Sequence, residues 1–479
     1  MTMFILPKTS NEPFLTVGYR GRYPIYFWPV HLSGRELTKH KHVVGLSGNG
    51  KSKFLVRCAA DLIMQGLPCS FIDPHGDSVN DLVGVLTARG YFKRPSAYER
   101  FLYVDFGRQD LFVPFNVLSQ KGFDSKTSAR NLVSALTRAY PELGITFRTL
   151  FYFSAFVLAE NKMPFTMTIS LLNDRQFRES LLTNVSDDLT LEFFHNEVDG
   201  WDARTLEDNV GSTKRRLYEL FSMPQLRYSL GQSENSLDFN KILNEGISVA
   251  YNLAGVHNDI RALIGCFLCV GYEQATFARE GISPEKRIPH HIIIDEAPLF
   301  IDRSAKTMMS LLSEARKYKI TEWLAHQYFD QLDDVFLGSL TNAQPIVYGV
   351  NYMDAEKAAH FLVHYDPYRV KHTITDEEMA GRSHPQWFSV QEQIEMMAHE
   401  IKSLQPRFAF IKRAIKYPFS PPTWQTVKYK TPDLGRLAPG REVEEICDYY
   451  ARLILKPARV AQKDSSPIRK LPIIQRFGK

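Results

Sequence analysis

The stretch Gly45-Leu46-Ser47-Gly48-Asn49-Gly50-Lys51-Ser52 decides the fold. It matches the pattern G-x-x-x-x-G-K-[ST] of phosphate-binding loops, and it lies between the apolar residues Val43-Val44 and an amphipathic segment from Phe54 to Gln65. A buried strand, a glycine-rich loop and a helix in this order surround phosphate oxygens with backbone N–H groups and a helix N-terminus. The stretch therefore predicts an α/β nucleotide-binding domain rather than a glycine-rich turn without a ligand.

Each part of this loop has an expected role. The glycines let the backbone curl so that its N–H groups point inward. Lys51 is expected to neutralise the β- and γ-phosphates, and Ser52 to ligate Mg²⁺. The predicted nucleotide contacts are Gly45, Ser47, Gly48, Asn49, Gly50, Lys51 and Ser52.

The rest of the chain alternates strand and helix signals around one long helical region. Short apolar runs predict strands at residues 43–45, 70–72, 101–104, 247–251, 291–294, 322–324 and 345–348. Helical patterns separate several of them, notably at 261–279 and 307–317, so we expect a mostly parallel sheet. We predict a strand-rich lead-in at 1–40, a nucleotide-binding domain at 41–120 and 240–415, an all-α insertion at 121–239, and a C-terminal extension at 416–479.

A second acidic motif, His291-Ile292-Ile293-Ile294-Asp295-Glu296, is expected on a strand next to the one that carries the loop. It is an apolar strand that ends in two carboxylates, at the edge where open α/β sheets bind ligands. Asp295 would hold Mg²⁺ through water, and Glu296 would orient and deprotonate the attacking water. Apolar strands that end in two acids are common in proteins. The motif therefore indicates nucleotide hydrolysis only together with the phosphate-binding loop.

Two further positions suit hydrolysis in an oligomer. Ala325-His326-Gln327 ends the following strand, so Gln327, with His326 as the alternate, is the candidate that detects the γ-phosphate. Arg316 precedes that strand and is a candidate for an arginine that reaches a neighbouring subunit's nucleotide. The alternative for Arg316 is a solvent-facing residue paired with Glu314 or Glu322.

In this order the motifs resemble the HerA–FtsK superfamily, and within it the coupling-protein ATPases of conjugative type IV secretion. The similarity spans about residues 15–365. It is carried by the loop, Phe71-Ile72-Asp73-Pro74-His75-Gly76-Asp77, Pro114-Phe115-Asn116, Ile294-Asp295-Glu296, Ser313-Glu314-Ala315-Arg316-Lys317 and Ala325-His326-Gln327. The features that best distinguish the coupling-protein ATPases are the Asp-Pro-His-Gly-Asp loop and the pairs Arg316-Lys317 and His326-Gln327.

The resemblance implies a RecA-like P-loop ATPase with an inserted all-α domain. It implies a hexameric ring that hydrolyses ATP with Mg²⁺ and moves DNA, with a relaxase or a secretion-channel component as a further partner. It also assigns Glu296, Gln327 and Arg316 to catalysis and Ser52 and Asp295 to the metal. Only 44 residues precede Gly45, and we see in them none of the transmembrane helices that membrane-anchored coupling proteins carry. We therefore expect a trimmed relative of these proteins, located in the cytoplasm or at the inner face of the membrane.

Composition agrees with a globular protein and excludes collagen-like, coiled-coil and largely disordered classes. Of 479 residues, 44% are hydrophobic and 23% are charged, and the five cysteines are too few for a disulfide framework, which favours a reducing compartment. The net charge of +5 does not by itself indicate nucleic-acid binding. Residues 451–479 carry +7 and the remaining 450 carry −2, so the positive charge is concentrated in a tail that we expect to be mobile.

Other signals have simpler interpretations. Asp73, His75 and Asp77 suit a structural loop better than a metal site. Cys266 and Cys269 lie in an apolar segment without a second pair for zinc, so we expect packed thiols. The run Lys214-Arg215-Arg216 is a solvated face or a DNA contact. Two rival functions stay open: an ATPase of a defence or protein-export complex that does not move DNA, and a DNA-binding module with a vestigial loop.

Overall fold

One large sheet forms the centre of the molecule. The computed structural model describes residues 13–22, 25–119, 123–140, 144–376, 382–415 and 423–457. Eleven strands are hydrogen-bonded in the order β2-β1-β14-β13-β10-β3-β9-β8-β4-β7-β5. In that order their bounds are Ile25–Leu32, Leu15–Arg22, Thr423–Lys430, Phe408–Ile415, Gln344–Tyr348, Lys41–Val44, Ile320–His326, His290–Ile294, Cys69–Asp73, Ser248–Asn252 and Phe101–Asp105.

The seven strands from β10 to β5 are all parallel, and β13, β14, β1 and β2 extend the sheet in antiparallel pairs. Every residue of β3, β4, β7, β8, β9 and β10 is buried. Parallel strands that are covered on both faces need continuous apolar runs, and these are the runs that predicted them. The expected α/β class with a mostly parallel sheet is confirmed.

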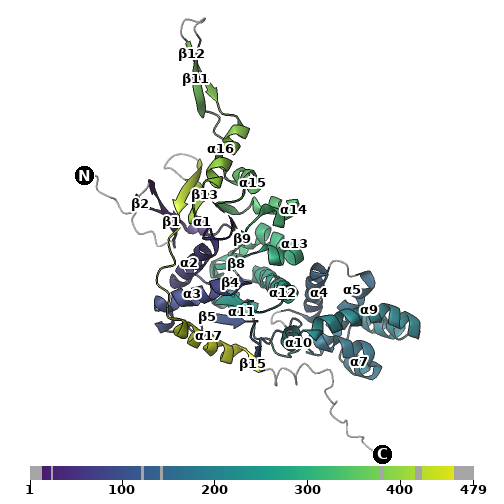
Figure 1. Cartoon of the computed structure of the whole chain (residues 1–479). Helices are drawn as coiled ribbons and strands as arrows, with labels where there is room; N and C mark the ends of the chain where they lie inside the picture. The colour runs from purple at the N-terminus through teal and green to yellow at the C-terminus, as the bar shows by residue number, and fades with distance from the viewer. Residues whose placement is uncertain are drawn as a thin grey trace, which may run out of the picture.

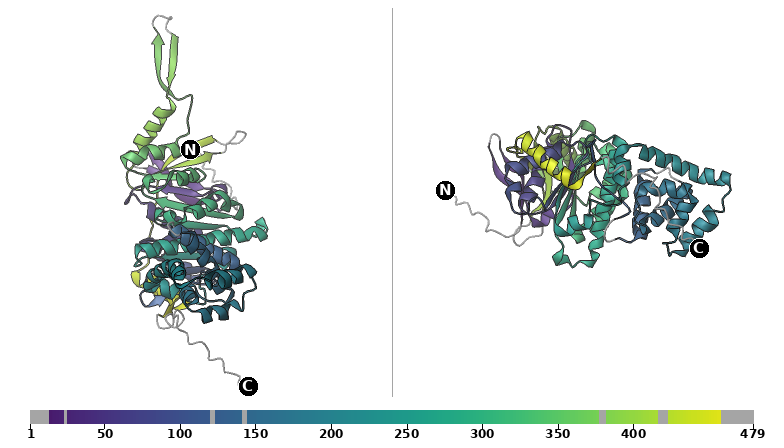
Figure 2. Two further views of the ribbon diagram at one scale, coloured as in Figure 1. Left: turned by 90° about the vertical axis from the view of Figure 1, so that its right-hand side faces the viewer. Right: turned by 90° about the horizontal axis from the view of Figure 1, so that it is seen from below.

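Helices cover both faces of this sheet (Figures 1 and 2). On one side α2 (Lys51–Met64) packs against α3 (Asp77–Ala88), which contacts α17 (Gly440–Ile454). On the other side α12 (Asn258–Phe277) packs against α13 (Pro298–Glu314). The short helices α1 (Gly34–Leu37) and α14 (Asp334–Leu340) precede β3 and β10.

Helices also fill the described residues between the short strand β6 (Leu111–Phe112) and β7. Most of them form a lobe beside the sheet, coloured blue to teal in Figures 1 and 2. They are α4 (Ser125–Ala139), α5 (Ile145–Glu160), α6 (Thr168–Asn173), α7 (Arg175–Leu182), α8 (Asp188–Glu192), α9 (Ala203–Ser222), α10 (Pro224–Leu230) and α11 (Phe239–Glu245). Asp124, Asp174, Asp187, Asp202 and Asp238 each cap one of these helices through the side chain, which explains where α4, α7, α8, α9 and α11 begin.

An arm that the sequence analysis did not predict extends from the far end of the molecule (Figures 1 and 2). It is the two-stranded hairpin of β11 (Val370–Asp376) and β12 (Arg382–Trp387), set between α15 (Tyr352–Leu362) and α16 (Val390–Lys402). At the other end β15 (Lys456–Pro457) pairs with β6, and the rest of the basic tail, residues 458–479, lies outside the described residues. None of the described helices has the length and apolarity needed to cross a membrane.

One expectation about neighbouring strands changes. The acidic strand β8 is not adjacent to β3, which carries the loop, because β9 pairs with both and separates them. His290 and His291, at the start of β8, are buried. His290 Nε2 bonds Ser70 Oγ at 2.8 Å and His291 Nδ1 bonds Thr321 Oγ1 at 2.6 Å, so both are packed residues.

Candidate nucleotide-binding site

The predicted phosphate loop joins β3 to α2, which begins at Lys51. Gly48 and Gly50 have φ values of +82° and +96°, which residues with a Cβ rarely adopt. Gly45 is required for another reason: a Cβ there would lie 2.4 Å from the Cβ of Tyr348 on β10. The loop therefore curls as expected, but its first glycine serves the close packing of β3 against β10.

Residues far away in the sequence hold this loop in place. The N–H of Leu46 and the side-chain amide of Asn49 both donate to the carbonyl oxygen of Gly349, at 2.9 and 2.7 Å. The N–H of Arg407 donates to the carbonyl oxygen of Asn49 at 2.9 Å, and its guanidinium pairs with Asp433 at 2.5 Å. Sequence reasoning missed Gly349 and Arg407, since no local pattern links them to a loop that lies 300 or more residues away. The side chain of Asn49 thus braces the loop.

Three predicted functional side chains meet at the end of β8 and β9. Lys51 Nζ lies 3.6 Å from Glu296 Oε1, and the amide of Gln327 donates to the same oxygen at 2.7 Å. Lys51 is only 4% exposed, so this charge pair is largely removed from water. These contacts link the loop, the acidic motif and the end of β9.

The backbone at Glu296 is strained. Its φ is +49°, in the left-handed region that costs a non-glycine residue about 1–3 kcal/mol. The turn is closed by the N–H of Ala297, which donates to the carbonyl oxygen of Ala325 at 2.8 Å. Backbone strain of this kind clusters at functional sites because the surrounding structure must sustain it. Here it aims the Glu296 carboxylate at Lys51 and Gln327.

Asp295 is buried beside the start of α3. Its carboxylate accepts from the Ser78 hydroxyl at 3.3 Å and from the N–H of Glu296 at 3.1 Å. Next to it, Asp73 accepts from the N–H groups of His75, Ser78 and Val79, at 2.9, 2.7 and 3.1 Å. Burial and, to a smaller extent, the charge of Asp295 raise the pKa of Asp73. Asp73 therefore organises the Asp-Pro-His-Gly-Asp loop, and the described residues contain no cluster of three His, Cys, Asp or Glu side chains suited to a metal.

The residues present suit a nucleotide with Mg²⁺. Ser52 stands in the first turn of α2 and is half-buried, and none of the described residues bonds its hydroxyl. A helix N-terminus, a buried ammonium and a carboxylate at one edge of a parallel sheet match the charges of a magnesium–phosphate group. Ser52, and Asp295 through water, would hold the Mg²⁺, and Glu296 would then be placed to take the proton of an attacking water.

His326 is not open to a phosphate. It is buried, its Nδ1 lies 3.0 Å from the carbonyl oxygen of Tyr328, and its Nε2 lies 2.6 Å from Nε2 of His42. With both ring nitrogens occupied, the alternate sensor candidate is used for packing, and Gln327 is the side chain that faces Glu296.

Arg316 lies at the opposite edge of the sheet. It belongs to the 3₁₀ helix Ala315–Tyr318, before β9, whereas Gln327 follows β9; a seven-residue strand separates them by about 20 Å. Its Nε donates to the carbonyl oxygen of Thr38 at 3.1 Å. Neither acidic partner expected for Arg316 forms an ion pair with it in the described part of the chain: Glu314 pairs with Lys317 at 2.8 Å, and Glu322 is fully buried. The distance along β9 decides the role that Arg316 can have. Arg316 therefore cannot reach its own chain's nucleotide.

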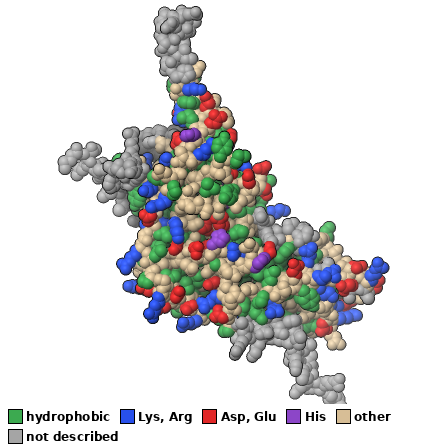
Figure 3. Space-filling view, in the orientation of Figure 1, with side chains coloured by type: hydrophobic (Ala, Val, Ile, Leu, Met, Phe, Trp, Pro, Cys, Tyr) green, Lys and Arg blue, Asp and Glu red, His purple; other side chains and the backbone are tan. Residues whose placement is uncertain are grey.

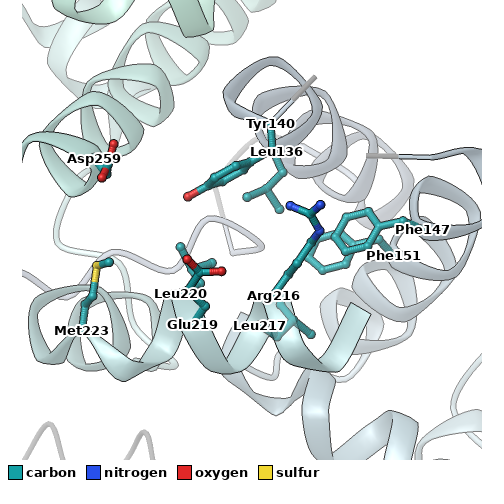
Figure 4. A pocket seen from close by; sticks show the side chains of 10 residues that line it. All are labelled: Leu136, Tyr140, Phe147, Phe151, Arg216, Leu217, Glu219, Leu220, Met223 and Asp259. Carbon is teal, nitrogen blue, oxygen red and sulfur yellow. The ribbon is translucent and has the colours of Figure 1, made fainter. Parts of the chain in front are cut away.

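The structure also shows where the two cysteines of the C-x-x-C pattern and the basic run 214–216 lie. Cys266 and Cys269 are buried thiols on α12, and neither forms a disulfide in the described part of the chain. The basic run on α9 divides: Lys214 and Arg215 lie near Glu207, while Arg216 lines a cavity of about 230 Å³ together with two acids, Glu219 and Asp259. Figure 4 shows this cavity between α4, α5 and α9, with Tyr140, Leu136, Phe147, Phe151, Leu217, Leu220 and Met223 around it. The run is therefore not one continuous basic face.

No family model matches the chain, and no curated protein matches it. Among solved structures, the unbound bacterial conjugative coupling protein TrwBdeltaN70 aligns with a TM-score of 0.55 and 14% identity over 86% of this chain and 89% of that one. The fold is similar to that of a conjugative coupling protein.

TrwB has also been solved with bound nucleotides. The complex with the ATP analogue ADPNP has a TM-score of 0.53 and 15% identity over 85% of this chain and 89% of that one. The complex with ADP and Mg²⁺ has a TM-score of 0.54 and 16% identity over 84% and 87%. At such low identity the likeness to TrwB establishes the fold.

Proposed function

We propose that the protein is a Mg²⁺-dependent ATPase that assembles into a homo-oligomeric ring, with six subunits as the expected number, and moves DNA as coupling-protein motors do. The observation that carries this proposal is the contact of Lys51 and Gln327 with one oxygen of Glu296. That arrangement joins a phosphate-binding lysine, a water-activating acid and a side chain able to detect the γ-phosphate. The TrwB complexes with ADPNP and with ADP and Mg²⁺ support the choice of nucleotide and metal.

The division of the chain follows from the same proposal. We take 41–120 and 240–415 as the nucleotide-binding domain, 121–239 as the inserted all-α domain, 1–40 as the lead-in and 416–479 as the C-terminal extension. β1, β2, β13 and β14 continue the sheet of the nucleotide-binding domain, so the lead-in and the extension would both be anchored on it. A site in the cytoplasm or at the inner face of the membrane, beside a relaxase or a secretion-channel component, suits this role.

The DNA contact would be local. On the face shown in Figure 3, Lys and Arg side chains alternate with Asp and Glu side chains, without one large basic area. Phosphate contacts in a ring need only a few basic groups from each subunit, because the ring repeats them.

ATP hydrolysis measured with and without DNA tests the proposal. We expect hydrolysis that requires Mg²⁺ and rises when single- or double-stranded DNA is added. Lys51→Ala should abolish it while the protein stays folded. Hydrolysis that no DNA stimulates would favour an ATPase of a defence or protein-export complex. Biological activity that survives Lys51→Ala would instead indicate a DNA-binding module with a vestigial loop.

A further inference from the structure

A large cavity opens at the edge of the sheet that lies opposite the nucleotide-binding loop. It has a volume of about 730 Å³, within the range of about 300–1,000 Å³ that holds small ligands. Lys39 and Arg316 lie at the starts of β3 and β9, and Gln344 begins β10, whereas the loop follows the end of β3. The ligand of this cavity is therefore not the chain's own ATP. We call it the basic cleft, after six of the residues that line it: Lys39, Arg316, His360, His364, Lys412 and Trp424.

The cations of the basic cleft form no ion pair with the described residues. No described carboxylate pairs with Lys39, Arg316 or Lys412, and no acidic side chain lines the cavity. Glu36, whose charge acts on Lys39, is engaged by Arg413 through two hydrogen bonds of 2.9 and 2.7 Å. Positive charges gathered without a counterion repel each other and favour an anion between them.

Burial disfavours the charged form of both lysines of the basic cleft. It lowers the pKa of Lys39; the charge of Glu36 opposes this shift, and the charge of Arg316 adds a smaller lowering. Burial also lowers the pKa of Lys412, which donates one hydrogen bond to the carbonyl oxygen of Val363 at 2.9 Å. Bound phosphate would offset both effects by restoring a partner to each ammonium.

An aromatic side chain stands among these cations. Trp424 is 42% exposed, and Lys39 Nζ lies 5.0 Å from the centre of its ring. His364 and Trp424 also line an adjoining cavity of about 430 Å³, whose walls include Tyr365, Arg369 and one acid, Asp366. The two cavities thus share residues and bring basic and aromatic groups together. Proteins that bind single-stranded nucleic acid combine cations for phosphates with aromatic rings for bases in this way.

We propose that the basic cleft and the adjoining cavity bind single-stranded DNA, with phosphates at Lys39 and Lys412 and a base against Trp424. This inference rests on the proposed function, which names DNA as the substrate, and it gives that substrate a site. A strand repeats phosphate and base, so consecutive nucleotides can occupy both cavities. A free mononucleotide would fill only one.

Binding of a fluorescently labelled single-stranded oligonucleotide to the full chain, measured by polarisation at several salt concentrations, tests the proposal. In Lys39→Gln/Lys412→Gln, loss of two phosphate contacts should weaken binding and reduce the slope of log K against log salt by about 1.4. Trp424→Leu should weaken binding by a factor between about 5 and about 150, and Trp424→Phe should retain most of the affinity.

The chain offers a matched control. Lys402 Nζ lies 3.7 Å from the ring centre of Tyr352, the same chemistry as Lys39 over Trp424 but outside both cavities. Lys402→Gln and Tyr352→Leu should bind the oligonucleotide as the wild type does. Because a cleft variant can also fail to fold, the wild type should be crosslinked to an oligonucleotide containing 5-iodouracil. The crosslink is expected at Trp424 or at Tyr365.

Folded cleft variants that bind single strands with wild-type affinity and salt slope would overturn the proposal, and so would crosslinks confined to other surfaces. Unchanged DNA binding with loss of DNA-independent ATP hydrolysis in Lys39→Gln/Lys412→Gln would overturn it too, because these two lysines would then serve a neighbouring subunit's nucleotide, the role that the proposed ring gives to Arg316 alone. A wild type that hydrolyses ATP but binds no DNA would overturn both this site and the DNA substrate of the proposed function. Wild-type DNA binding that the cleft variants leave intact would overturn the site alone.

Discussion

His42 and His326 meet Nε2 to Nε2 at 2.6 Å, buried between β3 and β9 directly before the two functional strand ends. His326 Nδ1 faces the carbonyl oxygen of Tyr328, so it carries the proton and leaves Nε2 as the acceptor. His42 must then donate from its Nε2. Through this pair the strand that carries the loop holds the turn around Gln327, whose amide contacts Glu296.

Replacing His42 by leucine should slow hydrolysis without weakening nucleotide binding. The change removes the donor to His326 and with it a support of the Gln327 turn, and we expect kcat to fall by about tenfold with unchanged ADP affinity. Steady-state kinetics and ADP titration measure the two effects. His291→Leu is the control, because His291 is equally buried and bonds Thr321 near the opposite end of β9. Equal losses of kcat in the two variants would indicate that the His42–His326 pair contributes only to packing.

Gln327→Ala should lower kcat by about 10- to 100-fold with little change in KM, since the Gln327 amide donates to Glu296, the proposed water-activating acid. If Gln327 acts through Glu296, the effect should disappear in a Glu296→Gln background, because effects of residues in direct contact are not additive. Single-turnover kinetics of the two single variants and the double variant measure this coupling. Additive losses would contradict a shared role.

Arg316→Ala should abolish hydrolysis and leave nucleotide binding intact, because Arg316 lies about 20 Å along β9 from its own site. Mixing Arg316→Ala subunits with Glu296→Gln subunits should restore activity, since some interfaces then combine an intact Glu296 with an intact Arg316. Lys317→Ala, whose side chain pairs with Glu314, serves as the control and should stay active. Mixtures that remain inactive at every ratio would exclude a role across the interface.

Stability should fall in mild acid. Burial, assisted by the charge of Lys51, lowers the pKa of His326 to about 4, against about 6.5 in an unfolded chain. Between these values the unfolded state binds the extra proton, so the free energy of unfolding falls as the pH decreases from about 6.5 to about 4. At pH 5 the loss attributable to His326 is about 2 kcal/mol relative to pH 7.5.

Burial also lowers the pKa values of four other histidines, namely His40, His42, His290 and His291. Each of these shifts also lowers the free energy of unfolding as the pH decreases. Denaturant unfolding of the wild type and His326→Phe across this pH range isolates the contribution of His326. The free energy of unfolding of the variant should depend less steeply on pH, by the equivalent of about one bound proton. Parallel pH curves for the two proteins would contradict the prediction.

Gly45→Ala should destabilise the fold more than Gly48→Ala. A Cβ at Gly45 would lie 2.4 Å from Tyr348 Cβ, so β3 and β10 would have to move apart. A Cβ at Gly48 meets nothing within 4 Å and costs only the strain of a positive φ, about 1 kcal/mol. Thermal unfolding compares the two, and equal losses of stability would indicate that the strands adapt.

The sequence by itself determined the local features. The loop from Gly45 to Ser52, the apolar runs of β3, β4, β7, β8, β9 and β10, and the carboxylates after β8 are all visible as short patterns, because strand and helix periodicity and loop chemistry depend on adjacent residues. The α/β class and the meeting of Lys51 with Glu296 follow from them. The carboxyl ends of parallel strands share one edge of the sheet, so motifs placed there come together.

Only the tertiary structure decided which strands are neighbours and which distant side chains meet. β9 separates β3 from β8, Arg407 and Gly349 brace the loop, and His42 finds His326 across 284 positions. The basic cleft likewise gathers Lys39, Arg316, Lys412 and Trp424 from four separate elements. Such contacts depend on how whole strands and helices pack, and an exposed lysine or tryptophan carries no local signal of the partner it will face.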